Sequence, residues 1–325
     1  MKHDIYCDYE FLEEFINQLK GKDLIEYLNS ADDYGVDLFR LFFNGSKIEL
    51  NKSNEEIIQL SKINPYINKL LKSGSLKESK IDVLDLDFEK ISPNMPFFLE
   101  KPQIETEKLI EKYGMWFFSK DRMSNVRQLF KLQSHNFTSR NNFKNFDFFQ
   151  KYQHPCNALI LTDDYFFTIK KGNDKIYDEN AIEKNLKPIL KRILPKKLGI
   201  DFQLTIILSP NDTNIDFNKI KSAIEDTTSL YEYPVKINFI KSNFHERHIF
   251  TNYYKITADK GFKNLVKDVR NDTFKWDHPK NSFEFRSIFY SITKDEDYLE
   301  KIAECKDRDE KGSKVGDSFK NRLLQ

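Results

Sequence analysis

The sequence has few of the residues that cross-link or interrupt a chain, since its 325 residues include 3 Cys, 10 Gly and 10 Pro. Cys7, Cys156 and Cys305 lie far apart without metal-ligand spacing, and three is an odd number, so we expect neither a disulfide framework nor a zinc site. No run of 18 apolar residues occurs, which excludes a membrane-spanning helix. The N-terminus also lacks the apolar segment of a signal peptide. We therefore expect a cytoplasmic protein without a metal or other cofactor.

Sequence motifs of several common enzyme classes are missing as well. The chain contains no G-x-x-x-x-G-K-[ST], G-x-G-x-x-G, H-E-x-x-H or G-x-S-x-G. This argues against common NTPases, dinucleotide oxidoreductases, zinc proteases and serine hydrolases. What the chain does have is 39% hydrophobic and 14% aromatic residues, including 29 Phe, which is enough to bury a core despite a charged fraction of 32%.

Charge is balanced over the whole chain but not locally. The formal net charge is +1, yet residues 1–110 carry 14 basic and 21 acidic side chains, and the remainder carries 38 basic and 30 acidic ones. Pro93, Pro96 and Pro102 interrupt the pattern near the change of sign and favour a domain boundary there. We predict an acidic, mainly helical N-terminal domain (1–105), a basic and aromatic connecting segment (106–150), an α/β domain (151–270) and a charged C-terminal extension (271–325).

Within the acidic domain, local sequence signals predict helices. Ser53 and Glu56 have the spacing of a capping box before an apolar run. A further helix over 66–72 is expected to end at Gly74, because glycine adopts the left-handed C-cap conformation most easily. Apolar residues at helical spacing mark another helix: Phe11, Leu12, Phe15, Ile16 and Leu19. Two short strands are predicted, at 5–6 and 82–86.

Asp8 follows the first of these strands, and Glu13 and Glu14 follow on the next helix. This order resembles the opening of PIN-like nucleases, which implies a metal-dependent nuclease. No matching set of downstream carboxylates is found, so the favoured interpretation is a solvated helix face. A requirement for a divalent metal would separate such a nuclease from a histidine-based mechanism, which needs no metal.

The region from about 150 to 270 alternates strand and helix signals. Residues 157–162 form a continuous apolar run that ends at Asp163 and Asp164, as a buried parallel strand does. Two more strands are predicted at 203–208 and 235–239. Two intervening helices are marked by Ile182, Leu186, Ile189, Leu190 and Ile193, and by Phe217, Ile220, Ile224 and Tyr231. This alternation predicts an α/β fold with a parallel sheet and right-handed crossovers.

A group of residues that could carry out a reaction follows the third predicted strand. His245, Arg247 and Asn252 have the spacing H-x-R-x4-N, which resembles the H-x-K-x4-D motif of the phospholipase D superfamily. If this segment is a strand, residues 245 and 247 point to the same face. The resemblance implies that His245 attacks phosphorus, that Arg247 holds the phosphate oxygens, and that Asn252 lies near the imidazole.

The wider stretch, from about Ala158 to Leu265, resembles the phospholipase D-like domain at the C-terminus of MIT-domain proteins and in free-standing bacterial relatives. It shares the single motif, the polar residue at Asn252 and a following turn, here Lys260-Gly261. The resemblance implies a phospholipase D-like sheet flanked by helices, with Arg247 and Lys260 binding phosphate.

The motif departs from the family pattern at two positions. Arginine in place of lysine keeps the charge but gives up protons less readily, and asparagine in place of aspartate removes a carboxylate that would stabilise a charged imidazole. Catalysis in this superfamily also needs a second histidine. His278-Pro-Lys280 supplies H-x-K, but Phe285 stands where the acid belongs. A complete site therefore requires a homodimer that pairs two copies of His245.

Neighbouring polar residues have simpler interpretations. By strand parity, His248 points away from His245 and is expected to be structural. Asp163 and Asp164 end the first predicted strand, at the edge where α/β sheets bind ligands, but a plain loop role is at least as well supported.

The connecting segment combines cations with aromatic rings, as single-strand binding surfaces do. Phenylalanine is frequent throughout this chain, so the alternative is that most of these rings belong to the core. The candidate nucleic-acid-binding cations are Lys120, Arg122, Arg127, Lys131, Arg140 and Lys144, and the rings are Phe130, Phe137, Phe143, Phe146, Phe148 and Phe149.

These observations lead to two main hypotheses. The first is a phosphodiester-binding, phospholipase D-like protein that acts as a metal-independent nuclease when dimeric. The family resemblance places such proteins in prokaryotic genome defence, with nucleic acid and other defence proteins as partners. The second is a non-catalytic interaction or scaffold protein, a subunit of a complex, whose degenerate pocket recognises an anion.

Overall fold

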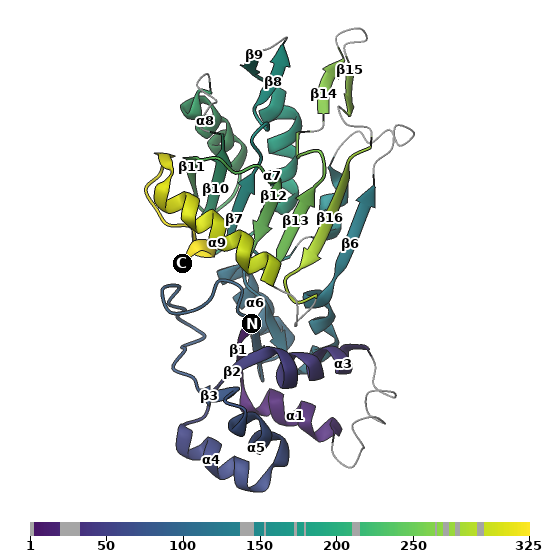
Figure 1. Ribbon diagram of the computed structural model, residues 1–325. Coiled ribbons are helices and arrows are strands. Elements are labelled where there is room, and N and C mark those ends of the chain that lie inside the picture. The colour runs from purple at the N-terminus through teal and green to yellow at the C-terminus, as the bar shows by residue number, and fades with distance from the viewer. Residues whose placement is uncertain are drawn as a thin grey trace. The chain divides into compact units, whose positions relative to one another are not determined.

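The computed structural model of the chain describes residues 3–19, 33–136, 146–152, 154–171, 174–178, 180–209, 215–263, 265–268, 273–276, 280–290 and 296–325. It separates into two compact units. We call Met1–Lys131 with Ile288–Asp297 the N-terminal unit, and Leu132–Ser287 with Tyr298–Gln325 the C-terminal unit. Both contain sheets and helices, so the protein is of mixed α/β class (Figure 1).

The N-terminal unit is built on a parallel sheet of five strands in the order β3-β2-β1-β4-β5. The strands are β1 (His3–Cys7), β2 (Ser46–Leu50), β3 (Leu76–Glu78), β4 (Phe97–Leu99) and β5 (Phe117–Ser119). The helices are α1 (Tyr9–Leu19), α3 (Asp33–Arg40) with its π-turn η1 (Leu41–Gly45), α4 (Asn54–Ile63), α5 (Pro65–Lys72), α6 (Gln103–Tyr113) and the 3-10 segment η2 (Lys120–Phe130). Strands are added to one side of β1 and then to the other, so the order reverses between β1 and β4.

Several local predictions for this unit are confirmed. The Ser53–Glu56 capping box begins α4, and α5 ends before Gly74, which has a φ of +66°. The five apolar residues predicted on one face of α1 are all buried. The prediction of a strand at 82–86 is wrong, because the Oδ1 of Asp82 accepts a hydrogen bond from Leu84 N and holds a turn there. The expectation of two strands missed most of the sheet, since β3, β4 and β5 have three residues each.

The C-terminal unit is built on a mixed sheet of eight strands in the order β17-β11-β10-β7-β12-β13-β16-β6. Strands β7 (Ala158–Thr162), β10 (Phe202–Leu208) and β11 (Val235–Lys241) are parallel, as predicted from their apolar runs. The antiparallel strands are β6 (Leu132–Asn136), β12 (His248–Thr251), β13 (Tyr254–Ala258), β16 (Ser282–Ser287) and β17 (Ser313–Gly316). Two hairpins stand apart from the sheet: β8 (Thr168–Lys171) with β9 (Asp174–Tyr177), and β14 (Leu265–Asp268) with β15 (Thr273–Trp276).

Helices cover both faces of this sheet. One face packs against the predicted helix η4 (Ile182–Leu186), which continues as α7 (Lys187–Ile193), and against α8 (Phe217–Thr228), which ends before Tyr231. The other face carries α9 (Glu296–Lys311), whose Tyr298 packs edge-on against Phe250 of β12. Two short 3-10 segments complete the unit: η3 (Asp147–Tyr152) and η5 (Arg322–Leu324).

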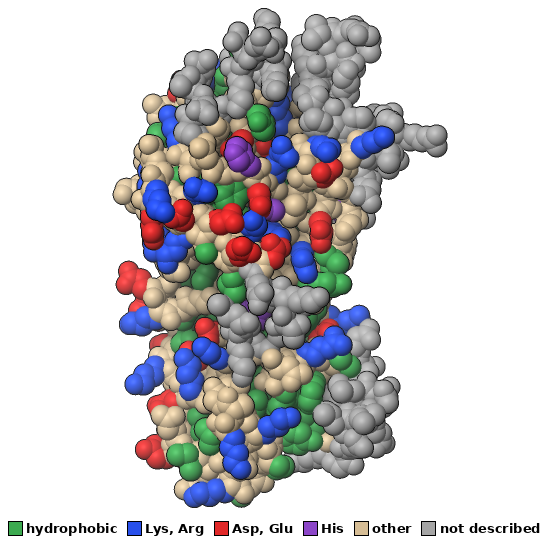
Figure 2. Space-filling view, in the orientation of Figure 1, with side chains coloured by type: hydrophobic (Ala, Val, Ile, Leu, Met, Phe, Trp, Pro, Cys, Tyr) green, Lys and Arg blue, Asp and Glu red, His purple; other side chains and the backbone are tan. Residues whose placement is uncertain are grey.

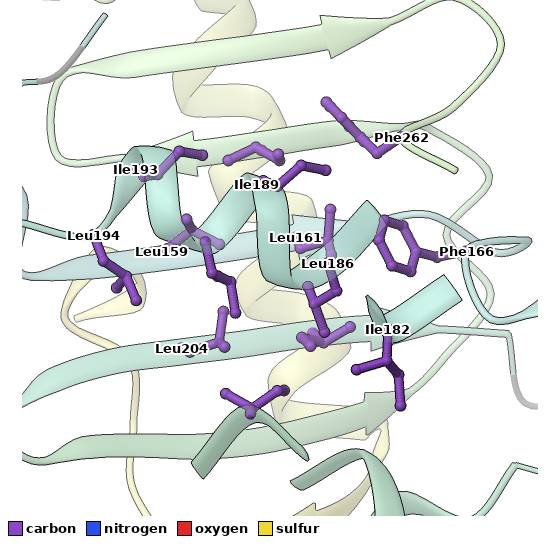
Figure 3. Packing of buried hydrophobic residues seen from close by; sticks show 14 of the residues in the cluster. Leu159, Leu161, Phe166, Ile182, Leu186, Ile189, Ile193, Leu194, Leu204 and Phe262 are labelled. Carbon is purple, nitrogen blue, oxygen red and sulfur yellow. The ribbon is translucent and has the colours of Figure 1, made fainter. Parts of the chain in front are cut away.

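The core of this unit explains its apolar runs. Leu159 and Leu161 of β7 lie against Ile189 of α7, while α9 is seen behind the sheet (Figure 3). Ile160, between the two leucines, is also fully buried, because the opposite face is covered too. A strand that is covered on both faces needs no polar alternation.

All three cysteines are unpaired and buried, and burial raises the pKa of each thiol, to about 12 for Cys156. Among the helices that the structure describes, none is both long and apolar enough to cross a membrane.

Candidate active site

Strand β7 marks the place where the strand order of the large sheet reverses. On one side it pairs with β10 and then β11, and on the other side with β12, which is antiparallel to it. Ligands of α/β sheets bind beyond the carboxyl ends of the strands at such points. Here two further segments meet the end of β7: the irregular segment 242–247 and the turn 259–263. Figure 2 shows histidine side chains beside acidic and basic ones on the face of this unit that carries α9.

Asp163 ties these segments together. Its side chain is buried and accepts hydrogen bonds from two backbone groups, Tyr165 N at 3.0 Å and Phe262 N at 2.9 Å. Burial raises the pKa of Asp163, and the two hydrogen bonds and the nearby Arg247 only partly offset this effect. Gly261 has a φ of +98°, and a Cβ there would lie 2.8 Å from the Oδ2 of Asp163. The turn can therefore approach the end of β7 only with glycine at this position.

Asp164 holds the candidate nucleophile. Its side chain is 5% exposed, and its Oδ2 lies 3.0 Å from the Nδ1 of His245, whose own side chain is 84% exposed. A carboxylate oxygen accepts hydrogen bonds, so we assign the imidazole proton to Nδ1. The lone pair of a neutral ring then lies on Nε2. An imidazole oriented in this way by a carboxylate is suited to act as a nucleophile or general base.

Arg247 brings a cation to the same edge. Its Nη1 donates to the backbone oxygen of Asp259 at 3.2 Å, and its guanidinium lies 5.9 Å from the centre of the Tyr165 ring. His245 and Arg247 thus each contact the segment that directly follows β7. A guanidinium and an exposed imidazole that both contact the residues following β7 are groups that can bind a phosphate.

A second, partly buried set of polar groups holds Glu246, which lies between His245 and Arg247 in the chain. The Nδ1 of His248 lies 3.1 Å from the Oγ1 of Thr257, and its Nε2 lies 2.7 Å from Oε2 of Glu246. Lys301 of α9 reaches the other oxygen of Glu246 at 2.7 Å. Burial opposes ionisation of Glu246, but hydrogen bonds from Lys301 and His248 lower its pKa overall. Because both ring nitrogens of His248 are engaged, we assign it a positioning role.

The predicted strand conformation of the motif is wrong. His245 and Arg247 lie in the irregular segment, and β12 begins only at His248. The ladder between β7 and β12 ends at Thr162, whose hydroxyl donates to the backbone oxygen of Glu246 at 2.9 Å and accepts from His248 N. This side-chain bridge replaces continued strand pairing, so strand parity does not orient residues 245 and 247.

Asn252 does not join the other motif residues. It is fully buried at the opposite end of β12, and its side chain exchanges two hydrogen bonds with Asn157, at 2.9 and 3.0 Å. The four residues of β12 separate it from His245 by about 13 Å or more. The predicted place of Asn252 near the imidazole is therefore wrong, and Asp164 stands there instead.

Lys260 lies on the turn beside Gly261. Its side chain is half exposed and its Nζ is 3.4 Å from the Oδ2 of Asp259, while its backbone N donates to Asn281 at 2.7 Å. It is placed at the same edge as Arg247, and a phosphate there would compete with Asp259 for its ammonium group.

The predicted basic and aromatic segment divides between the two units. Lys120, Arg122, Arg127 and Lys131 belong to the N-terminal unit, where Lys120 lies 3.6 Å from Glu100. Three of the rings are buried in the core of the C-terminal unit: Phe146, Phe148 and Phe149. Arg140, Lys144, Phe137, Phe143 and His278 lie outside the described residues. The interpretation of the rings as core residues is confirmed for those three.

Asp8 lies at the corresponding edge of the small sheet. Its Oδ1 accepts from the hydroxyl of Tyr6 at 3.2 Å and its Oδ2 from Glu100 N at 2.9 Å. Burial raises its pKa, and Glu13 is bonded to the hydroxyl of Tyr9 at 2.8 Å. Over the ranges that the structure describes, no group of three or more His, Cys, Asp or Glu is placed to hold a metal ion.

The sequence was also compared with protein-family models and with curated proteins, and neither comparison finds a match. The geometry at the end of β7 is therefore the basis for assigning a function. Two residues of the candidate site, Glu246 and Lys301, could not be predicted from the sequence. They become neighbours only when α9 packs on the sheet.

Proposed function

We propose that the C-terminal unit is a phospholipase D-like module that binds phosphodiesters and cleaves them through His245 without a metal. The observation that supports this most is the exposed imidazole of His245 on the buried carboxylate of Asp164. The motif lacks an acid at Asn252, which argued against turnover. Asp164 would supply that acid from the turn after β7, which would compensate for the loss.

The chemistry follows from the positions of the groups. Arg247, with Lys260 nearby on the turn, would hold the non-bridging oxygens of the phosphate. Nε2 of His245 would attack phosphorus, forming a P–N bond as the P–O bond to the leaving group breaks. Asp164 would stabilise the resulting imidazolium, and water would then release the phosphate from His245.

The leaving oxygen needs a proton. His248 is a poor donor, because it is buried and both its nitrogens are engaged. We therefore propose that the protein acts as a homodimer, in which His245 of the second copy supplies the proton. Genome defence, with nucleic acid and other defence proteins as partners, is the biological setting that fits a cytoplasmic nuclease of this kind.

The second candidate function, a non-catalytic protein that recognises an anion, is favoured by one feature. Three aspartates lie near the basic groups, Asp163 near Arg247, Asp164 on His245 and Asp259 on Lys260, so the local charge is not strongly positive.

The test is incubation of the purified protein with labelled single- and double-stranded DNA and RNA in EDTA, with its mass measured by light scattering. We expect cleavage by the wild type, none by His245→Ala, and a rate lowered about 100-fold by Asp164→Asn, which removes the orienting charge. Asp8→Asn is the matched control, because Asp8 occupies the same place in the other unit, and its rate should be unchanged. Intact substrates in every lane would support the non-catalytic, anion-binding function instead. Cleavage by His245→Ala at the rate of the wild type would contradict the proposal.

A further inference from the structure

An exposed aromatic ring stands beside the candidate phosphate site. Tyr165 is 42% exposed, whereas Phe166 and Phe167, which follow it, are fully buried. Its backbone N donates to Asp163 Oδ1, and Phe166 N donates to the backbone oxygen of Asp163 at 3.2 Å, so the turn is fixed. The two buried rings and the two hydrogen bonds hold Tyr165 outward at the end of β7.

A single exposed tyrosine is ordinary on a protein surface, but this one is next to Arg247. The guanidinium lies 5.9 Å from the ring centre and is anchored to the backbone of Asp259. A fixed cation and a fixed ring at neighbouring positions match the two parts of a nucleotide. The cation binds the phosphate and the ring stacks on the base.

The surroundings argue against a lipid phosphodiester. Among the described residues of the C-terminal unit, the large hydrophobic side chains that are exposed are Tyr165 and Leu230. Leu230 lies in the turn between α8 and β11, away from the end of β7 at which the strand order reverses. One ring gives too little apolar surface to receive acyl chains, but it is enough for one base.

We propose that the ligand of this site is single-stranded nucleic acid, with Tyr165 stacking on the base next to the phosphate that Arg247 and His245 hold. The inference rests on the proposed function and adds the substrate class. Single strands are favoured because a base in a duplex is already stacked and does not offer its face.

The test compares two oligonucleotides of equal length and charge, oligo(dT) and the same backbone with abasic sites throughout. Binding is measured by fluorescence anisotropy in EDTA at fixed salt, in a His245→Gln background so that no strand is cut. We expect Tyr165→Ala to weaken binding of oligo(dT) about tenfold, within the range for the loss of one stacked base, and to leave abasic binding unchanged. Tyr165→Trp should retain the preference for oligo(dT), and Tyr165→Leu should not.

The outcomes separate the two proposals. Equal losses on both oligonucleotides would overturn the base-stacking role, because Tyr165 would then only position Arg247. Equal affinity of the parent protein for the two oligonucleotides would also overturn it, while leaving the phosphate site intact. Arg247→Ala should weaken both alike, and an unchanged affinity for both would contradict the phosphate site itself. Absence of binding to either oligonucleotide would overturn both proposals.

Discussion

The two units of this protein place aspartates at the same topological position but use them differently. In each unit an aspartate follows the first parallel strand, where the strand order reverses: Asp8 after β1, and Asp163 with Asp164 after β7. Such positions are where α/β sheets bind ligands. The topology therefore allows a ligand site in both units. Any difference in ligand binding between the units must come from the side chains.

In the N-terminal unit the carboxylates at this edge are engaged by hydrogen bonds from neutral groups or by an ion pair. Asp8 is bonded to Tyr6 and Glu100 N, and Glu10 lies 3.1 Å from Lys52. In the C-terminal unit the aspartate is doubled. Asp163 holds the turn, and Asp164 is left to orient an exposed imidazole. With two carboxylates at this edge, Asp163 can stabilise the turn while Asp164 orients the imidazole of His245.

The largest expected effect concerns the close approach in the C-terminal unit. Gly261→Ala puts a Cβ 2.8 Å from the Oδ2 of Asp163 and 3.3 Å from the Cδ of Arg247, at a φ of +98°. We expect a loss of about 3 kcal/mol in stability, combining the cost of positive φ with that of overpacking. Hydrogen exchange of the backbone amides of β7 and β10 would measure this loss of stability.

Gly74→Ala is the matched control in the N-terminal unit. Gly74 also has a positive φ, +66°, but no atom lies within 4 Å of an added Cβ. Its loss should be only about 1 kcal/mol, the cost of the backbone conformation alone. If Gly261→Ala and Gly74→Ala lost equal stability, the close approach of the new Cβ to Asp163 would have no energetic cost.

The next effect separates the two aspartates directly. Asp163→Asn should destabilise the C-terminal unit by about 2 kcal/mol, because both carboxylate oxygens accept backbone N–H groups and the new amide NH2 would face one of them. Asp8→Asn should cost at most about 0.5 kcal/mol, because the hydroxyl of Tyr6 can accept a hydrogen bond as well as donate one. Urea unfolding with hydrogen exchange of β1 and β7 distinguishes the units.

The pH dependence provides an independent check on these variants. Burial raises the pKa of Asp8 and of Asp163, so the folded protein binds these protons more tightly than the unfolded chain. Stability should therefore fall as the pH rises from about 4, the ordinary pKa, through the raised value. Asp8→Asn should remove its share of this fall in the N-terminal unit, and an unchanged profile would contradict the burial of charge there.

The sequence predicted the fold well where elements are long and fully covered. The apolar runs of β7 and β10 and the helical spacing over 182–193 correspond to the structure, because burial on both faces leaves no other pattern. The three-residue strands β3, β4 and β5 give too few residues for any periodicity to show.

The candidate site was predictable only in part. The motif identified His245 and Arg247, but spacing along one segment could not find a partner in the turn after β7, about 80 residues earlier. Asp164 was therefore predicted only as the end of a strand, and Asn252 was predicted in the position beside the imidazole that Asp164 occupies. The hydroxyl of Thr162, which ends the strand pairing, carries no sequence signal either, because threonine is common in strands.

The smallest expected effect compares one ion pair from each unit. Lys301→Met removes the contact with Glu246 and also that with Glu304 on its own helix, and Lys52→Met removes the contact with Glu10. Both pairs are partly exposed, so each change should cost less than about 1 kcal/mol in stability. Only Lys301→Met should also weaken phosphate or oligonucleotide binding, about twofold, because Glu246 lies between His245 and Arg247 and fixes their segment.

The sign of the pH effect follows from the lowered pKa of Glu246. Its contribution to stability is present above the ordinary pKa of about 4.3 and is lost as the pH falls through the lowered value. Lys301→Met should reduce that acid sensitivity in the C-terminal unit, measured by thermal unfolding between pH 3 and 7 (about the range in which carboxyls titrate). If both lysine variants weakened oligonucleotide binding equally, the difference between the two edges would be one of charge alone, and the positioning role of Glu246 would be wrong.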